Sequence, residues 1–366
     1  MDKSASPGFL AAEARRAANV SGVDFSDWGY EIVAGPETAV PQSLVDTVDA
    51  DEVWAPAVRL RYAIAGVDEL PTRKPVSLVV ARRGDCWALV TDSATIDARA
   101  QTWRGPWDFG PLVSRSVDTG DGRTSVVLGH PEDSEMVDHL AEELPAAVDN
   151  VTQLWGSDWA ERALVWVAGS QEEFTALVGP DHDGRNIAAV AISDAVDPDS
   201  DVVTGQRIVF SPASPERLTN VTRRAILQHE MTHVATRAAT VDGSPMWMLE
   251  GYAEYAAHRG THTAERRIAP TLTAWVSAEG APGSFPDDRD FAGSGARGSL
   301  AYESAWSINA FVADEFGEAR LTRLYRALAV GKADPQTVDQ RVADVLGIDG
   351  DQFRGGWTNW VRAHLG

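Results

Sequence analysis

The chain changes its sequence pattern near residue 130, and this change limits its fold more than any other feature. Before that point, short β-branched and aromatic runs with partial alternation are separated by Gly, Asp and Pro, which is typical of antiparallel strands. After residue 163, three short strand-like runs and one helix give way to segments of helical periodicity. A small sheet followed by helices is an α+β arrangement. With 366 residues, the chain is also long enough for two separate cores.

We therefore predict an α+β protein in three parts. Residues 1–130 form an Ala-rich helix near 8–19 and several antiparallel strands, with Gly84-Asp85 as a two-residue hairpin turn. Residues 131–160 form a bridging helix, and residues 161–366 form a small sheet and mostly helices. One helix with a curved antiparallel sheet resembles the cone-shaped NTF2-like fold, and this resemblance of pattern covers roughly residues 5–130.

Charge and hydropathy exclude several classes of partner. The chain carries 54 acidic and 32 basic side chains, a net charge of −22, so neither nucleic acid nor anionic lipid is expected to bind. No apolar run approaches the roughly 20 residues that span a bilayer, so we expect no direct membrane insertion. The first twenty residues lack the apolar core of a signal peptide. We expect the extracytoplasmic soluble part of a longer bacterial precursor, with a cytoplasmic location and the oligomeric state left open.

The segment ILQHEMTHVATR (226–237) carries the first indication of chemistry. His229 and His233 are one helical turn apart, so both imidazoles project from one face and can bind the same divalent metal. Glu230 is rotated by about 100° around the axis, which suits it to a metal-bound water rather than to the metal. Histidine pairs of this spacing also occur on surfaces and in cores, so the motif alone does not establish a zinc site. Cys86 is the single cysteine, which excludes a cysteine-based site.

A second helix strengthens the metal interpretation. SPMWMLEGYAEYAAHRG (244–260) places Glu250 and Glu254 four residues apart in an otherwise apolar stretch, where two carboxylates on one face are poorly solvated unless paired. A cation between the two helices would pair them. Two histidines and one glutamate with an open fourth position are a catalytic zinc arrangement. Spacing alone permits either glutamate as the third ligand.

These residues carry a family resemblance. HEMTH, followed after sixteen residues by the Glu of WMLEGYAEY, resembles the gluzincin metallopeptidases over roughly residues 160–366. The resemblance implies a zinc ion held by His229, His233 and Glu250, with Glu230 as general base. It also implies that Glu254 orients a ligand histidine and that the strand RIVFSP (207–212) is a sheet edge that receives substrate. The chain departs from the family in two respects, because Met248 stands where Leu is usual and no GAMEN sequence is present.

The oxyanion of the tetrahedral intermediate needs a donor besides zinc. Tyr302 is the candidate because it lies where gluzincins often supply a tyrosine, and the alternative is a tyrosine packed in the core. His258 and His262 are weaker candidates for this role. The remaining histidines have no chemical partners in the sequence and are predicted to be surface residues: His130, His139, His182 and His364.

The leading functional prediction is a zinc-dependent metallopeptidase that hydrolyses a peptide or protein substrate through a zinc-bound water activated by Glu230. One alternative is a zinc-binding, non-hydrolytic surface protein whose NTF2-like domain recognises a ligand or partner. Another is a zinc hydrolase acting on a non-peptide amide or ester, which the same site chemistry would serve. Cleavage preference, and exopeptidase against endopeptidase action, stay open.

Overall fold

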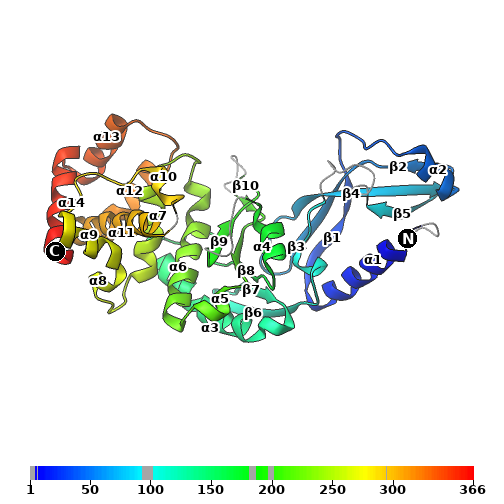
Figure 1. Ribbon diagram of the computed structural model, residues 1–366, viewed down its shortest axis with the longest axis horizontal. Coiled ribbons are helices and arrows are strands. Elements are labelled where there is room, and N and C mark those ends of the chain that lie inside the picture. The colour runs from blue at the N-terminus through cyan, green and yellow to red at the C-terminus, as the bar shows by residue number, and fades with distance from the viewer. Residues whose placement is uncertain (1–4, 6, 93–101, 181–186, 197–201, 294) are drawn as a thin grey trace. The chain divides into compact units, whose positions relative to one another are not determined.

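A computed structural model shows an α+β protein (Figure 1). It describes residue 5 and residues 7–92, 102–180, 187–196, 202–293 and 295–366. The chain forms two compact units. Unit 1 comprises residues 1–142, 164–195 and 204–215, and unit 2 comprises residues 143–163, 196–203 and 216–366.

Unit 1 holds two five-stranded sheets, and its N-terminal part has the predicted helix α1 and several antiparallel strands, together with a helix, α2, and a strand, β2, that the sequence pattern did not predict. The first sheet has the order β1-β3-β4-β2, with β5 also paired to β4, and every pairing in it is antiparallel. Gly84 and Asp85 form the predicted turn between β4 and β5, and Gly84 has a φ of 58°. The bounds are α1 Pro7–Asn19, η1 Val20–Gly22, β1 Phe25–Ile32, α2 Gln42–Val48, β2 Glu52–Trp54, β3 Ala57–Ile64, β4 Thr72–Arg83 and β5 Cys86–Asp92.

The second sheet is mixed and has the order β6-β7-β8-β12-β9. β7, β8 and β12 are parallel to one another, whereas β6 and β9 pair antiparallel at the two edges. The bounds of its elements and of those beside it are η3 Pro106–Asp108, β6 Val113–Gly120, β7 Arg123–Gly129, η4 Pro131–Asp133, α3 Ser134–Trp155, β8 Leu164–Val167, α4 Gln171–Val178, β9 Ala189–Ile192, β10 Ala195–Val196, β11 Val203–Thr204, β12 Arg207–Phe210 and α5 Ser214–Arg217.

This second sheet differs from the sequence expectation in two ways. β6 and β7, assigned from their pattern to the N-terminal antiparallel sheet, belong instead to the second sheet, where β7 pairs with β8 from beyond residue 160. The strand expected at a sheet edge, β12, is paired on both sides, and β9 is the edge strand. Periodicity identifies a strand but not its neighbours, which explains both differences. The division at residue 131 and the NTF2-like resemblance stay predictions.

The two sheets of unit 1 share one core. Buried side chains from both sheets form a single cluster that includes Tyr62, Trp107 and Trp166. Arg207 of β12 is 2% exposed and binds Asp68 with two hydrogen bonds of 2.7 and 2.9 Å. A buried guanidinium is tolerated because this carboxylate neutralises its charge in a bidentate geometry.

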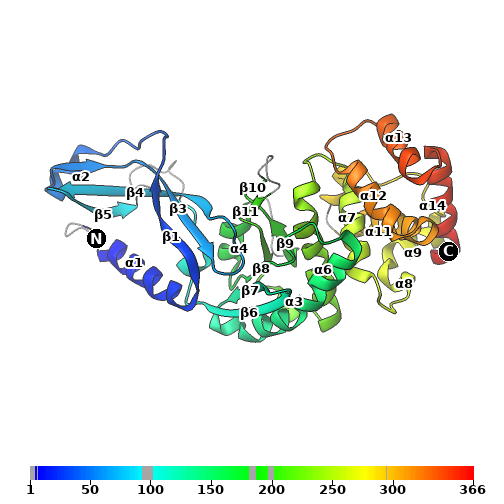
Figure 2. The same cartoon turned by 180° about the vertical axis from the view of Figure 1, so that it is seen from behind.

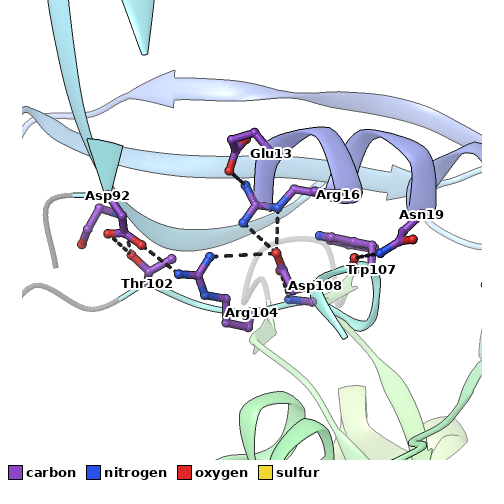
Figure 3. A network of polar contacts seen from close by, with 10 residues as sticks. Glu13, Arg16, Asn19, Asp92, Thr102, Arg104, Trp107 and Asp108 are labelled. Atoms are coloured by element: carbon purple, nitrogen blue, oxygen red, sulfur yellow. Dashed lines mark hydrogen bonds and ion pairs between the residues drawn. The ribbon is translucent and has the colours of Figure 1, made fainter. Parts of the chain in front are cut away.

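A polar network fixes α1 to the segment around η3 (Figure 3). Arg16 of α1 donates to Asp108 over 2.7 Å and also pairs with Glu13. Arg104 pairs with Asp92 at 2.8 Å, and Asn19 donates to the carbonyl of Trp107 over 2.8 Å. The network closes one side of a cavity of about 60 Å³ between α1 and the first sheet.

His130 is buried, so its prediction as a surface residue is wrong. The residue is 6% exposed, with Nδ1 of its ring 3.0 Å from the carbonyl oxygen of Pro111 and Nε2 2.8 Å from Oε2 of Glu173. Both partners are acceptors, so both ring nitrogens donate when Glu173 is ionised, and the ring is then an imidazolium. Burial alone would lower the pKa of His130, but Glu173 outweighs it and raises that pKa. His139 and His364 are partly exposed, and His182 lies outside the described residues.

This buried pair predicts a pH dependence of stability. Because the pKa of His130 is raised on folding, the folded chain holds the proton more tightly. The free energy of unfolding should therefore fall as pH rises from about 6.5 through the folded-state pKa, by up to about 1.4 kcal/mol per pH unit. Asp133, the other acid beside the ring, also has a pKa raised by burial. Urea unfolding across this range should show the slope in the wild type and a smaller slope in His130→Gln. Equal slopes in the two proteins would contradict the assignment of His130 as the group that causes the pH dependence.

Unit 2 is helical and contains the candidate site. α7 packs against both α6 and α11 (Figure 2). No helix in the described parts of the chain combines the length and the apolar character needed to cross a bilayer. Besides the end of α3, the helices are α6 Asn220–Thr236, η5 Arg237–Ala239, α7 Met246–His258, α8 Glu265–Ile268, α9 Pro270–Glu279, α10 Asp288–Phe291, α11 Ala296–Phe316, α12 Glu318–Leu328, α13 Pro335–Leu346 and α14 Gly350–Leu365.

Candidate metal centre

Helix α6 carries the two histidines on a well-anchored scaffold. Thr219 caps its N-terminus by accepting a hydrogen bond from the Thr222 amide over 3.2 Å. Its apolar face, with Leu227 and Met231 fully buried, lies in the core as the sequence stripe predicts. At its C-terminal end, Thr236 accepts a 3.0 Å hydrogen bond from the buried hydroxyl of Tyr325. The position of the histidine face is therefore set from both ends of the helix.

Helix α7 brings the two glutamates to this face. It begins after Pro245, and the carboxylate of Asp288 accepts a hydrogen bond from the Met246 amide over 2.9 Å. Trp247 and Met248 are buried on its apolar side, and the hydroxyl of the buried Tyr252 lies 2.9 Å from the Thr322 hydroxyl of α12. Glu250 and Glu254, one turn apart on this helix, are only partly exposed.

Three potential ligand atoms converge between α6 and α7. Nε2 of His229 and Nε2 of His233 are 3.1 Å apart. Oε2 of Glu250 lies 3.3 Å from the first nitrogen and 3.5 Å from the second. Ligand atoms at 2.0–2.1 Å from a tetrahedral zinc ion would be separated by about 3.3 Å. The three distances therefore fit one zinc ion, with a fourth position left for water or substrate.

The two glutamates contact opposite sides of the same imidazole. Whereas Glu250 faces Nε2 of His229, Oε1 of Glu254 lies 3.4 Å from Nδ1 of that ring. A carboxylate on Nδ1 holds the ring in the orientation and tautomer that present Nε2 to a metal. The sequence spacing left the two acids equivalent, and the structure gives them different partners.

The pKa values of these groups reflect their mutual contacts. Burial alone would lower the pKa of His229, but hydrogen bonds to Glu250 and Glu254 outweigh it and raise that pKa well above the usual value. Burial alone would raise the pKa of Glu250, but the charge of His233 and the hydrogen bonds from both histidines hold it far below its usual range. The pKa of Glu254 is lowered in the same way, mainly by His229. Both acids are therefore anionic at neutral pH, as a cation site needs.

Glu230 and Tyr302 lie close to this cluster. Glu230 is 8% exposed, and its charge raises the pKa of both His229 and Tyr302. Burial is the largest cause of the raised pKa of Tyr302, followed by the charges of Glu250, Glu230 and Glu254. A phenol with a raised pKa stays protonated and can donate a hydrogen bond. Its ring packs edge-to-face on Phe291, with centroids 5.2 Å apart.

The two histidines considered as rivals of Tyr302 lie elsewhere. Nε2 of His258 is 3.7 Å from Oε2 of Glu254, so it faces the acid behind His229 rather than the metal position. Burial lowers the pKa of His258, which favours its neutral form. His262 is exposed and does not join the cluster. The contact of His258 could have been anticipated, because Glu254 and His258 are spaced i, i+4 on one helix.

Comparisons with solved structures give distant likenesses. An M1 zinc metallopeptidase from Deinococcus radiodurans is 12% identical, with a TM-score of 0.41, and the match covers 92% of this chain and 61% of that one. Yeast LTA4 hydrolase is 13% identical with a TM-score of 0.42, covering 84% and 44%. An aminopeptidase A from Legionella pneumophila, in complex with aspartic acid, is 13% identical with a TM-score of 0.40, covering 93% and 33%.

No protein-family model and no curated protein matches the chain. The chain spans less than two thirds of the length of each of these three structures. Likenesses at this identity and TM-score assign neither activity nor site residues. The assignment of the site therefore depends on its own geometry.

Proposed function

We propose that unit 2 is a zinc-dependent metallopeptidase that hydrolyses peptide bonds. The observation that carries the proposal is the convergence of His229, His233 and Glu250 at mutual distances that fit a tetrahedral zinc ion. The buried Glu230 beside them supplies a carboxylate that a purely structural metal site does not need. The resemblance to gluzincins in sequence gives each of these residues the same role.

Each residue of the site has a physical task in this reaction. His229, His233 and Glu250 would hold the metal, which when bound polarises the scissile carbonyl and makes water more acidic. Glu230 accepts the proton of the attacking water and passes it to the leaving amine. Glu254 fixes the ring of His229 from its Nδ1 side. Tyr302 donates a hydrogen bond to the carbonyl oxygen as negative charge develops on it.

The variant Tyr302→Phe tests whether Tyr302 donates a hydrogen bond to the carbonyl oxygen in the transition state. We expect zinc content to be unchanged and kcat to fall by about 10²- to 10³-fold, with a smaller change in KM, because the hydrogen bond is strongest in the transition state. The ring of the variant keeps its contact with Phe291, so stability should change little. Steady-state kinetics on a cleaved peptide give the answer. Wild-type kinetics in this variant would make Tyr302 a packing residue.

A cleavage assay tests the proposal as a whole. Purified chain is incubated with a mixture of unlabelled peptides, and the products are identified by mass spectrometry. Cleavage that a chelator abolishes and that one equivalent of zinc restores is the expected result. Bound zinc without cleavage of any peptide, but with hydrolysis of simple esters or amides, would favour the hydrolase of non-peptide substrates. Zinc without any hydrolysis would favour the binding protein.

The cavity described between α1 and the first sheet is small. The cavity of about 60 Å³ between α1 and the first sheet has space for only a few water-sized molecules. Pockets for small-molecule ligands usually enclose roughly 300–1,000 Å³. Two ion pairs, from Arg16 to Asp108 and from Arg104 to Asp92, also occupy the polar groups that a ligand would contact (Figure 3).

A further inference from the structure

We propose that Gly251 and Asn309 are positioning residues that hold Tyr302 against the metal centre by keeping α7 and α11 in close contact. The inference rests on the proposed function, because it concerns the donor that this function needs. The sequence does not reveal this contact, since Gly251 carries no side chain and Asn309 lies far along the chain. Its basis is the packing of the two helices.

Gly251 is the point of closest approach between the helices. A Cβ atom built at this position would lie 2.1 Å from Nδ2 of Asn309 and 2.3 Å from the backbone oxygen of Ala305. Real Cβ atoms essentially never show contacts under 3.0 Å. The side chain of Asn309 could move, but the backbone oxygen of Ala305 moves only with its helix. Any side chain at residue 251 therefore pushes α11 away from α7.

Asn309 bridges the same crossing with hydrogen bonds. It is fully buried, and its Nδ2 donates to the backbone oxygen of Trp247 in α7 over 3.1 Å and to that of Ala305 in α11 over 3.0 Å. Both acceptors are carbonyls, so the orientation of the amide is defined. Buried hydrogen bonds of this kind are costly to lose, because the groups left behind stay out of water.

Tyr302 shares the helical face of this crossing. Residues 302, 305 and 309 of α11 are spaced i, i+3 and i+7, so they lie along one face. On α7, the ligand Glu250 is the immediate neighbour of Gly251. The distance between the two backbones at this crossing therefore sets the distance from the Tyr302 hydroxyl to the metal position. The ligands lie on α6 and α7, so a shift confined to α11 leaves them in place.

Gly251→Ala is the direct test. We expect zinc content near that of the wild type, a small change in KM and a fall in kcat of about 10²-fold, the loss typical of a misplacement of about 1 Å. Gly355→Ala is the matched control, because a Cβ atom added to this helical glycine of α14 would meet no atom within 4 Å. The control should keep wild-type kinetics, and its stability should equal or exceed that of the wild type, because alanine favours a helix more than glycine does.

A double-mutant cycle separates positioning from general damage. If Gly251→Ala acts through Tyr302, its effect on kcat should shrink to less than about threefold in a Tyr302→Phe background. The inference would be overturned if the losses of kcat from the two single variants multiplied in the double variant, or if Gly251→Ala had the kcat of the wild type. Should Gly251→Ala not fold, Asn309→Ala replaces it in the cycle, with the same two outcomes.

The affinity for a zinc-chelating ligand can be measured in the same set of variants without turnover. Acetohydroxamate chelates zinc and places an oxygen near the donor, so Tyr302→Phe and Gly251→Ala should weaken its binding in a non-additive way. If the wild type cleaves no peptide, the proposed function fails, and this binding cycle still decides whether the crossing positions Tyr302. Additive losses of acetohydroxamate affinity would overturn the inference while leaving the metal site in place.

Discussion

Glu250→Ala should purify without zinc, whereas Glu254→Ala should keep zinc with an affinity reduced by 10- to 100-fold. Oε2 of Glu250 lies within 3.5 Å of Nε2 of both histidines, so its loss removes a direct ligand. Oε1 of Glu254 lies against Nδ1 of His229, on the side away from the metal position. Losing a partner that orients a ligand histidine typically costs 10- to 100-fold in metal affinity or activity.

A competitive chelator titration with a zinc indicator measures this difference. The two variants control for each other, because both remove a partly buried carboxylate from the same face of α7. If Glu254→Ala lost more zinc affinity than Glu250→Ala, Glu254 would be the ligand and Glu250 would be the acid that orients His229. Equal and negligible losses would mean that neither acid touches the metal.

Glu230→Gln should keep one zinc per chain and lose turnover by about 10²- to 10⁴-fold, the range usual for a removed general base. Glutamine has the same shape but does not accept the proton. The residue is buried beside His229 yet is not among the converging ligand atoms, so the metal should stay in place.

Single-turnover kinetics and zinc analysis on the same preparation test this result. Loss of stoichiometric zinc from Glu230→Gln would make Glu230 a ligand and would contradict the roles assigned to this motif. Glu132→Gln is a suitable control, because this exposed acid of unit 1 belongs to no part of the site. It should behave as the wild type in both measurements.

Much of the fold could be predicted from local pattern, but the pairing of strands could not. Alternation and turn residues predict the antiparallel strands before residue 130 and the turn at Gly84-Asp85, because these signals are local. The partnership of β7 with β8 depends on contacts across a helix of more than twenty residues, which no local period encodes. For the same reason, the edge position of β9 follows only from the assembled sheet.

The candidate site, like the fold, could be predicted from the sequence only in part. Helical spacing is sufficient to bring His229 and His233 to one face, since the geometry of one turn is fixed. Spacing could not separate Glu250 from Glu254, because the side of the imidazole that each acid meets depends on how α6 and α7 pack. The burial of His130 was missed because its partners, Pro111 and Glu173, are 19 and 43 residues away in the chain.

The central claim is that two histidines and one glutamate hold a single zinc ion, and X-ray absorption at the zinc edge tests it most directly. The predicted result is one zinc per chain, with two imidazole nitrogens at about 2.0–2.1 Å and the remaining ligands oxygen. His229→Ala and His233→Ala should each lose the ion. A zinc spectrum without imidazole scattering, or full zinc occupancy in either variant, would contradict the account.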